Sequence, residues 1–441
     1  MKKSQENKIT GFCKTGQRKI IACHNLKPLF AMEVFADQDS YFEQAKDSVE
    51  RKFDERFFNS RDIVIISGVR RCGKSTLLQQ IRTKQSEKDY HLNFDDERLV
   101  NFSVADFQML LELFYELFGK QKTFYFDEIQ NVCQWERFVR RLHDTGNKVF
   151  ITGSNARMLS RELGTHLTGR YLPFELYPFS FKEFIAFKKP ELPVKNHFKT
   201  SVKAEILALF HEYFNDGGFP GFLKTKDELG LKMLFENILY RDIMVRNNIT
   251  NEKEIKKLVF YMAGNYARLS TNSDLADYIG VKNPSTVKKY IGFLADSYLV
   301  FQTNKFDYSL SAQLLNPKKT YLIDNGLVRR VGFSLSDNLG HLLENLVYVE
   351  LKRRGKEIYY HKKGRECDFV IKEGNSITGA IQVAYSMEND KTRKREIDGL
   401  LDAMDAYGLR TGTIITDDMQ EEFTERGKTI QIIPAWKWLL S

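Results

Sequence analysis

The sequence predicts an α/β fold with a parallel sheet, because three apolar segments of strand length each end in polar residues. We expect these strands at Ile63–Ile66, Thr123–Gln130 and Lys148–Asn155. A helix over Tyr41–Phe58 is expected to pack beside the sheet, since apolar residues recur there at three or four positions. At 441 residues the chain is long enough for about three domains, so the sheet accounts for part of it.

The first strand leads into a glycine-rich loop and then a helix. Gly68, Gly73, Lys74 and Ser75 stand at the G-x-x-x-x-G-K-[ST] spacing of a phosphate-binding P-loop. The glycines permit the torsions that turn N–H groups toward phosphate oxygens, and the positive end of the helix faces the same point. We expect Lys74 to reach the β- and γ-phosphates of ATP and Ser75 to bind Mg²⁺; the alternative is a chance match in a glycine turn. The predicted nucleotide contacts are Gly68, Val69, Arg70, Arg71, Cys72, Gly73, Lys74, Ser75 and Thr76.

Two adjacent carboxylates end the second strand, in the string TFYFDEIQ. Asp127 would hold Mg²⁺ through its water shell, and Glu128 would polarise the water that attacks the γ-phosphate. Asp-Glu after an apolar run is by itself only a strand end. Because a P-loop strand and a further strand at Tyr90–Phe94 precede it, the pair instead predicts the acidic motif of an ATPase site.

Polar residues at the end of the expected strand Lys148–Asn155 extend this site, as does an arginine before a further expected strand at Tyr171–Leu176. Ser154 or Asn155 would contact the γ-phosphate or the water, with a simple turn as the alternative. Arg170 would complete a neighbouring subunit's site as an arginine finger, so a homo-oligomer is expected if it does. A surface salt bridge is the alternative for Arg170.

Composition limits the compartment and the partners that can be expected for the chain. Lys and Arg outnumber Asp and Glu by 67 to 58, and this excess of +9 permits nucleic-acid contact without requiring it. The five cysteines are odd in number and scattered, which argues for a reducing compartment. No apolar run approaches the roughly twenty residues of a membrane helix, and the Lys-rich start lacks a signal-peptide core. We therefore expect a cytoplasmic protein with no membrane partner, with residues 1–31 as a disordered leader.

Several strings, taken in order, resemble one family. They are GVRRCGKSTLL, FYFDEIQ, ITGSN, LTGRYLPFELYPFSFKEF and GGFPGF, and they are similar to uncharacterised prokaryotic AAA+ ATPases with a C-terminal restriction-endonuclease-like domain. The resemblance extends over nearly all of residues 32–441 and implies ATP binding and hydrolysis, but no substrate. The domains it implies are an AAA+ core at 32–185, a helical lid at 186–252, a winged helix-turn-helix at 253–335 and a nuclease-like domain at 336–441.

The middle of the chain fits the lid and the winged helix. Leu231–Ile249 resembles the small helical lid whose movement opens and closes a nucleotide site, and Arg241 in it would read nucleotide state or form an ion pair. Three helices between Ile255 and Asp296, followed by two strands, look like a winged helix-turn-helix. The module would contact DNA, or a protein partner instead. Its recognition helix would carry Lys282, Asn283, Ser285, Thr286, Lys288 and Lys289.

The C-terminal part looks like the core of PD-(D/E)xK nucleases, in which acidic groups bind Mg²⁺ and a lysine positions the nucleophilic water. Glu344 lies on an expected helix, and Asp368 and Gln382 lie on expected strands. Gln382 stands where a metal-binding Glu is usual, and Ala384 stands where the lysine should be. We therefore expect a degenerate second metal site, with binding or scaffolding rather than cleavage as its role. The residues that would have to fold back to replace the lysine are Lys391 and Arg393.

The sequence as a whole predicts an ATPase that hydrolyses ATP with Mg²⁺ to drive conformational change in its C-terminal modules, with DNA as a candidate partner. The second hypothesis is a nucleotide-gated switch that binds a protein partner and no DNA, and the third is an ATP-gated endonuclease. The predicted catalytic residues are Lys74, Glu128, Arg170 and Asn155, the metal ligands are Ser75 and Asp127, and the degenerate metal site is Glu344, Asp368 and Gln382.

Overall fold

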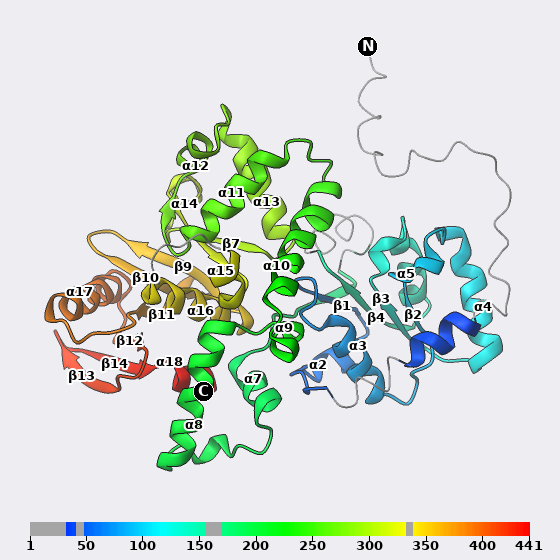
Figure 1. The fold of residues 1–441 in the computed structure, drawn as a ribbon, viewed down its shortest axis with the longest axis horizontal. Coiled ribbons are helices and arrows are strands. Elements are labelled where there is room, and N and C mark those ends of the chain that lie inside the picture. Colours follow the sequence, from blue (N-terminus) through cyan, green and yellow to red (C-terminus); the bar gives the residue numbers. More distant parts are fainter. Residues whose placement is uncertain (1–31, 41–47, 156–166, 168, 332–337) are drawn as a thin grey trace. The chain divides into compact units, whose positions relative to one another are not determined.

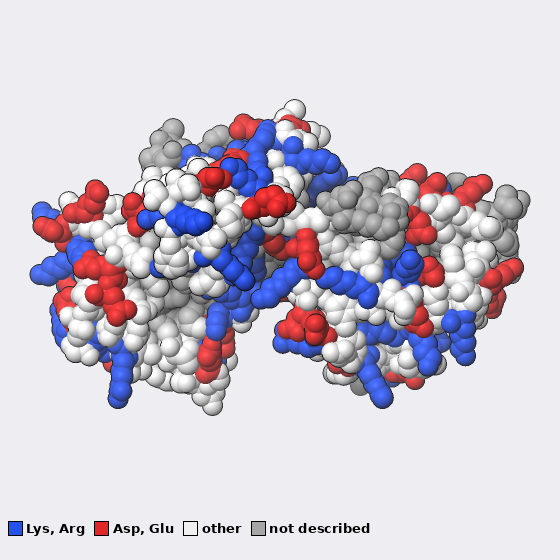
Figure 2. All heavy atoms as spheres, turned by 90° about the horizontal axis from the view of Figure 1, so that it is seen from below, with Lys and Arg blue, Asp and Glu red and all other residues white. Residues whose placement is uncertain are grey.

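The computed structural model describes residues 32–40, 48–155, 167, 169–331 and 338–441 (Figure 1), so the expected leader at 1–31 lies outside the described residues. The chain forms two compact units. The N-terminal unit comprises residues 32–40, 48–66, 75–153, 167 and 169–174, and the C-terminal unit comprises 67–74, 154–155, 175–331 and 338–441. On the face that Figure 2 shows, Lys and Arg are interspersed with Asp and Glu. Among the described helices, none combines the length and apolar character that a bilayer crossing requires.

A five-stranded sheet organises the N-terminal unit, with strand order β2-β3-β4-β1-β5. The pairs β2–β3 and β3–β4 are parallel, so the predicted parallel sheet is confirmed. All five residues of β1 are buried, as expected for a strand covered on both faces. The strands are β1 (Ile63–Ser67), β2 (His91–Asn93), β3 (Thr123–Asp127), β4 (Lys148–Gly153) and β5 (Tyr171–Glu175).

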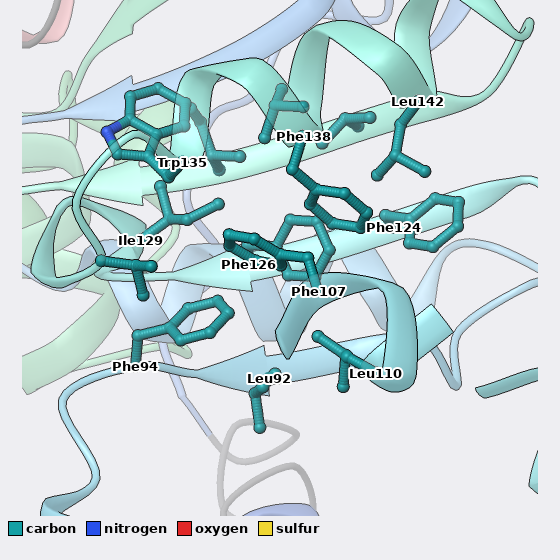
Figure 3. Close-up of a cluster of buried hydrophobic side chains, with 14 of the residues drawn as sticks. Leu92, Phe94, Phe107, Leu110, Phe124, Phe126, Ile129, Trp135, Phe138 and Leu142 are labelled. Carbon is teal, nitrogen blue, oxygen red and sulfur yellow. The ribbon is translucent and has the colours of Figure 1, made fainter. Parts of the chain in front are cut away.

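Aromatic side chains fill the core on one face of this sheet (Figure 3). Helices α4 (Phe107–Phe118) and α5 (Trp135–Asp144) supply Phe107 and Phe138, whose rings stack with centroids 4.2 Å apart. Phe138 also contacts Phe126 of β3 at 5.9 Å between centroids. This packing fixes β3, the strand that ends in Asp127.

The helix expected over Tyr41–Phe58 is wrong in its described part. Residues 48–55 are not helical, and only the short α2 (Arg56–Asn59) forms; residues 41–47 lie outside the described residues. The backbone N–H of Arg51 donates to Gln80 Oε1 at 3.0 Å, so this segment finds hydrogen-bond partners outside a helix. Its apolar periodicity serves aromatic contacts instead, such as Phe53 with Phe57 at 5.1 Å.

Helices follow at the start of the C-terminal unit, where the lid is predicted. They are α7 (Phe181–Lys188), α8 (Thr200–Asp216), α9 (Pro220–Thr225), α10 (Glu228–Asn237) and the π-helix η7 (Ile238–Val245). The glycine pair after α8 packs on Asp324, whose carboxylate accepts the N–H of Gly218 at 2.7 Å. A Cβ at Gly217 would lie 2.0 Å from Asp324 Oδ1, so the GGFPGF string requires glycine there. Burial raises the pKa of Asp324 to about 6, despite backbone N–H groups that favour its charged form.

Three helices and a three-stranded sheet come next. The helices are α11 (Glu252–Gly264), α12 (Asn272–Ile279) and α13 (Pro284–Asp296), and the strands are β6 (Leu269–Ser270), β7 (Val300–Thr303) and β8 (Lys318–Leu322). The sheet order is β6-β8-β7, and both pairs are antiparallel. The predicted elements are therefore present, together with β6 and the short helix α14 (Leu310–Leu315), which the sequence did not indicate.

A six-stranded sheet completes the C-terminal unit, with order β13-β14-β12-β11-β10-β9. Helix α16 (Leu339–Arg353) precedes it, and α17 (Asp390–Tyr407) packs on β10, β11 and β12 (Figure 1). β9, β10 and β11 pair antiparallel, whereas β11, β12 and β14 pair parallel. The bounds are β9 (Glu357–Lys362), β10 (Glu366–Glu373), β11 (Ser376–Val383), β12 (Thr411–Thr416), β13 (Glu421–Glu425), β14 (Lys428–Pro434), α15 (Asn325–Val331) and α18 (Ala435–Leu440).

Candidate nucleotide-binding site

The predicted P-loop joins β1 to α3 (Lys74–Thr83). Gly68 and Gly73 have φ angles of +156° and +103°. A Cβ on Gly68 would lie 2.1 Å from the carbonyl oxygen of Leu176, so no other residue fits there without displacing backbone. Lys74 is buried, and its Nζ donates to the carbonyl oxygens of Gly68 and Val69, both at 3.2 Å. The lysine thus lies against the loop whose phosphate ligand it is predicted to bind.

Side chains of the C-terminal unit hold this loop. Arg70 binds the buried carboxylate of Asp242 in η7 with Nε and Nη2, at 2.9 and 3.2 Å. Ser67, at the end of β1, accepts a hydrogen bond from the Tyr298 hydroxyl at 2.7 Å. Tyr298 has a φ of +60°, an uncommon conformation for a residue with a large side chain. Arg241, which the sequence singled out in this helix, is exposed, and its neighbour Asp242 makes the contact.

Ser75 and Asp127, the two predicted Mg²⁺ ligands, line one pocket of about 850 Å³ in the N-terminal unit. Asp127 is buried, and its Oδ1 accepts a short hydrogen bond from the hydroxyl of Thr152. The same Thr152 oxygen accepts the backbone N–H of Glu128 at 3.0 Å. Thr152 was not among the residues predicted from the sequence. Its signal is its place at the end of β4, the strand beside β3, one residue after Ile151 pairs with Phe126.

Glu128 follows Asp127 in a left-handed conformation, with φ 49° and ψ 40°. Non-glycine residues in this region are uncommon and cluster at functional sites. The amide of Gln130 donates a short hydrogen bond to Glu128 Oε2. Backbone and side chain of the predicted catalytic carboxylate are therefore both fixed, by Thr152 and by Gln130.

Part of the pocket lining comes from β2 and from residues 32–40, which are helical. Gln38 donates to the carbonyl oxygen of Asn93 at 3.1 Å and to Asp96 Oδ2 at 3.0 Å. The guanidinium of Arg98 holds the pKa of Asp96 at about 2. His91 also lines the pocket, and burial lowers its pKa well below the usual value, so the imidazole is neutral at pH 7.

Ser154, Asn155 and Arg170 are the other predicted residues of the nucleotide site, and none of them lines the pocket of Ser75 and Asp127. Ser154 and Asn155 are buried after β4, and the Ser154 hydroxyl has no hydrogen-bond partner among the described residues. Which of them serves the γ-phosphate stays a prediction. Arg170 precedes β5, at the amino end of the sheet, and its Nε binds Asp144 at 3.1 Å. The surface ion pair weighed for Arg170 is therefore present, and a role on a neighbouring subunit stays a prediction.

The predicted second site also has its residues together. Glu344, Asp368 and Gln382 line a cavity of about 700 Å³ in the C-terminal unit. Gln382 Oε1 accepts the backbone N–H of Asp368 at 3.1 Å, and Asp368 Oδ2 accepts that of Val383 at 3.0 Å. Within the described ranges, no group of three or more His, Cys, Asp or Glu side chains is arranged to hold a metal ion.

Neither lysine substitute that the sequence suggested lines this cavity. Arg393 instead binds Glu421 at 2.7 Å, and Lys391 is absent from the lining residues. A different lysine does reach the carboxylates: Lys319, on β8 of the three-stranded sheet. No pattern in the sequence indicated Lys319, because it lies outside the nuclease-like region.

A buried strand, a glycine-rich loop, a helix and an acidic residue on another strand of the same sheet define a nucleotide-binding domain of the AAA type. The family described as "AAA domain" matches residues 60–185. Two families described as domains of unknown function match residues 207–337 and 339–438. The nuclease-like character of the last region therefore stays a prediction.

Whole-chain relatives identify the family. The uncharacterized protein MJ1544 of Methanocaldococcus jannaschii is 36% identical over 400 residues, covering 86% of this chain and 88% of that protein. The chain belongs to this family of uncharacterised prokaryotic AAA-type ATPases. An uncharacterized protein of Haemophilus influenzae is 31% identical over 403 residues, covering 87% of this chain and 96% of that protein.

Solved structures with lower similarity include two archaeal proteins. The Aeropyrum pernix ORC1 protein in complex with DNA is 10% identical, with a TM-score of 0.28, over 68% of this chain and 91% of that one. Cdc6p from Pyrobaculum aerophilum is 12% identical, with a TM-score of 0.24, over 71% of this chain and 98% of that one.

Proposed function

We propose that the chain hydrolyses ATP with Mg²⁺, using Lys74, Ser75, Asp127 and Glu128. The observation that supports this most is the pocket that Ser75 and Asp127 share. A hydroxyl and a carboxylate are the oxygen ligands that Mg²⁺ prefers, so the residues fit the ion. When bound, Mg²⁺ neutralises charge that develops on the phosphate oxygens.

Each protein group has a distinct role in this proposal. Lys74 exchanges the carbonyl oxygens of Gly68 and Val69, which it contacts at 3.2 Å, for phosphate oxygens. Thr152 holds Asp127 in place through its hydroxyl. Glu128 orients and polarises the attacking water, and Asn155 contacts the γ-phosphate.

Phosphate release by full-length chain tests the catalytic role. Glu128→Gln keeps the shape of the side chain and removes its charge, so turnover should fall by about 100-fold or more while MgATP still binds. Glu112→Gln is the matched control, because Glu112 is exposed on α4. Unchanged turnover in Glu128→Gln would remove this residue from catalysis.

ATP binding is proposed to drive a conformational change in the C-terminal modules through Arg70 of the P-loop. Arg70 is bound by Asp242, and an arriving phosphate competes for the same guanidinium. Asp242→Asn should weaken that link while leaving turnover within about tenfold. Hydrogen exchange over residues 228–245 should then lose its response to a non-hydrolysable ATP analogue. Arg241→Gln, on the exposed neighbour, serves as the control and should keep the response.

DNA is the favoured partner of the three-helix module, with a protein partner as the alternative. Lys282, Lys288 and Lys289 are exposed at or before α13. Burial, together with the charge of Lys288, lowers the pKa of Lys318. Lys288→Ala with Lys289→Ala should weaken DNA binding and lower its salt dependence. The matched control replaces Lys199 and Lys203, two exposed lysines on and before α8. Equal DNA binding by both double variants would favour a protein partner.

Assembly is a separate question. If Arg170 acts on a neighbour's phosphates, native mass measurement with a non-hydrolysable ATP analogue should show a homo-oligomer that Arg170→Ala does not abolish, although turnover falls. An ATP-gated endonuclease is the least supported alternative, because Gln382 and Ala384 stand where that activity needs an acid and a lysine.

A further inference from the structure

The ammonium of Lys319 lies among three carboxylates of the C-terminal unit. Its Nζ is 2.9 Å from Glu344 Oε1, 2.9 Å from Glu366 Oε1 and 2.8 Å from Asp368 Oδ1. Lys319 is 2% exposed, and Glu344 and Asp368 are also buried. An ammonium has three N–H donors. Each donor therefore has one carboxylate oxygen, and none remains to position a water molecule.

Lys319 comes from β8, whereas its partners come from α16 and β10. The side chain of Asn345 fixes β8 against α16, because it accepts the N–H of Leu322 at 2.8 Å and donates to the same residue's carbonyl at 3.1 Å. Tyr321 donates to Glu344 Oε1 at 2.7 Å and stacks on Tyr348 at 4.0 Å between ring centroids. The position of the ammonium is therefore set by the junction of two sheets.

The other cationic side chains that line this cavity have carboxylates of their own. Arg395 binds Glu396, and Arg365 binds Asp398 at 3.2 Å. Burial lowers the pKa of His341, which favours its neutral form. Lys319 is thus the cationic side chain that contacts Glu344, Glu366 and Asp368 together.

We propose that the ammonium of Lys319 is the resident cation of this centre and takes the place of a divalent metal ion. The carboxylate oxygens stand at 2.8–2.9 Å from Nζ, which is hydrogen-bond distance. A Mg²⁺ ion would need them at about 2.0–2.1 Å, so it cannot share the position with the ammonium. The centre joins β8 to α16 and β10 as a charged link between the two sheets.

The proposal predicts that a metal site opens when the ammonium is removed. Lys319→Met removes the charge and leaves carboxylates that repel one another, so its thermal unfolding midpoint in EDTA should fall by about 5 °C or more. Excess Mn²⁺ should restore most of that loss, because a divalent cation can draw the carboxylates together. Mn²⁺ binding, counted by electron paramagnetic resonance without nucleotide, should rise by one ion per chain over wild type.

Two controls separate this effect from others. Lys318→Met removes the neighbouring lysine on β8 and should neither gain an ion nor respond to Mn²⁺. Adding Asp368→Asn to Lys319→Met should abolish the extra ion, which distinguishes this centre from the Ser75 and Asp127 pocket. Three results would overturn the proposal: Mn²⁺ binding by wild type that Asp368→Asn removes, no additional ion in Lys319→Met, or a Lys319→Met chain that fails to fold even with Mn²⁺.

Discussion

The two acidic centres of this chain are built from similar groups and differ in what neutralises them. In the N-terminal unit Asp127 is supported by the neutral hydroxyl of Thr152, and it lines a pocket together with Ser75. In the C-terminal unit Glu344 and Asp368 bind the ammonium of Lys319, a permanent part of the chain. The hydroxyl of Thr152 positions Asp127 through a hydrogen bond and brings no cation with it. A carboxylate held by an ammonium has that charge already balanced.

The same difference shows in how acids near the two centres titrate. The Arg98 guanidinium holds the pKa of Asp96, in the N-terminal pocket, at about 2. Burial and the charge of Asp368 raise the pKa of Glu344 to about 8, even though Lys319 and Tyr321 favour its ionised form. Asp96 is therefore ionised at neutral pH, whereas burial favours the protonated form of Glu344.

The largest contrast is expected from removing the lysine of each centre. Lys74→Ala should weaken MgATP binding by about 100-fold or more, because the loop loses its one side-chain ammonium for the phosphates. Lys319→Met should leave MgATP affinity within about twofold, since Lys319 is not among the residues that line the pocket of Ser75 and Asp127. Isothermal titration of both variants measures this. A loss of ATP affinity in Lys319→Met would show that the two centres are not independent.

The second contrast concerns the hydrogen bonds that position Asp127 and Glu128, and not the charge of a lysine. Thr152→Val keeps the shape of the side chain and removes the hydroxyl that holds Asp127 and the N–H of Glu128. Turnover should fall by about 10–100-fold, as for loss of a positioning hydrogen bond, while MgATP affinity changes little. Single-turnover phosphate release and a binding titration separate the two quantities. An equal loss in both would assign Thr152 to nucleotide binding instead.

The nucleotide site was predictable because its parts are local in sequence or lie at the ends of strands of one sheet. Gly68 to Ser75 form one continuous motif, and Asp127 ends a strand whose apolar run is plain in the sequence. Thr152 could have been inferred from strand order, had the sequence revealed that β4 lies beside β3. The helix expected over Tyr41–Phe58 failed because its apolar spacing serves ring contacts in an irregular segment.

The acidic residues of the C-terminal centre were predictable, but Lys319 was not, because its contact with them depends on tertiary structure. Glu344, Asp368 and Gln382 follow a recognisable order along one region. Lys319 precedes that region, and its partners lie 25, 47 and 49 positions later (344 − 319, 366 − 319 and 368 − 319). A search for the lysine near β11 could not find it, because the contact depends on how Asn345 fixes β8 against α16. The same is true of Arg70 and Asp242, which are 172 positions apart.

A smaller effect should appear in the way the unfolding free energy of the C-terminal unit depends on pH. The folded pKa of Glu344 lies above its ordinary value of 4.5, so its contribution to stability is present below pH 4.5 and is lost as pH rises through about 8. The slope from this one group cannot exceed about 1.4 kcal/mol per pH unit. Glu344→Gln should flatten the dependence between pH 5 and 8. Urea unfolding in a Trp135→Phe background, in which Trp436 and Trp438 report on this unit, measures it.

The smallest effect on stability should come from Asp96. Its contribution to stability grows as pH rises, whereas that of Glu344 declines. The folded pKa of about 2 lies below the ordinary value of 3.8, so the contribution of Asp96 is present above pH 4 and is lost as pH falls toward 2. Because Arg98 is partly exposed, we expect Asp96→Asn to cost about 1 kcal/mol of unfolding free energy at pH 7 and little at pH 2.5. Fluorescence of Trp135, with Trp436 and Trp438 changed to Phe, isolates the N-terminal unit. If Asp96→Asn lost the same stability at both pH values, the ion pair with Arg98 would not be its source, and neutral hydrogen bonds such as the one from Gln38 would carry the effect instead.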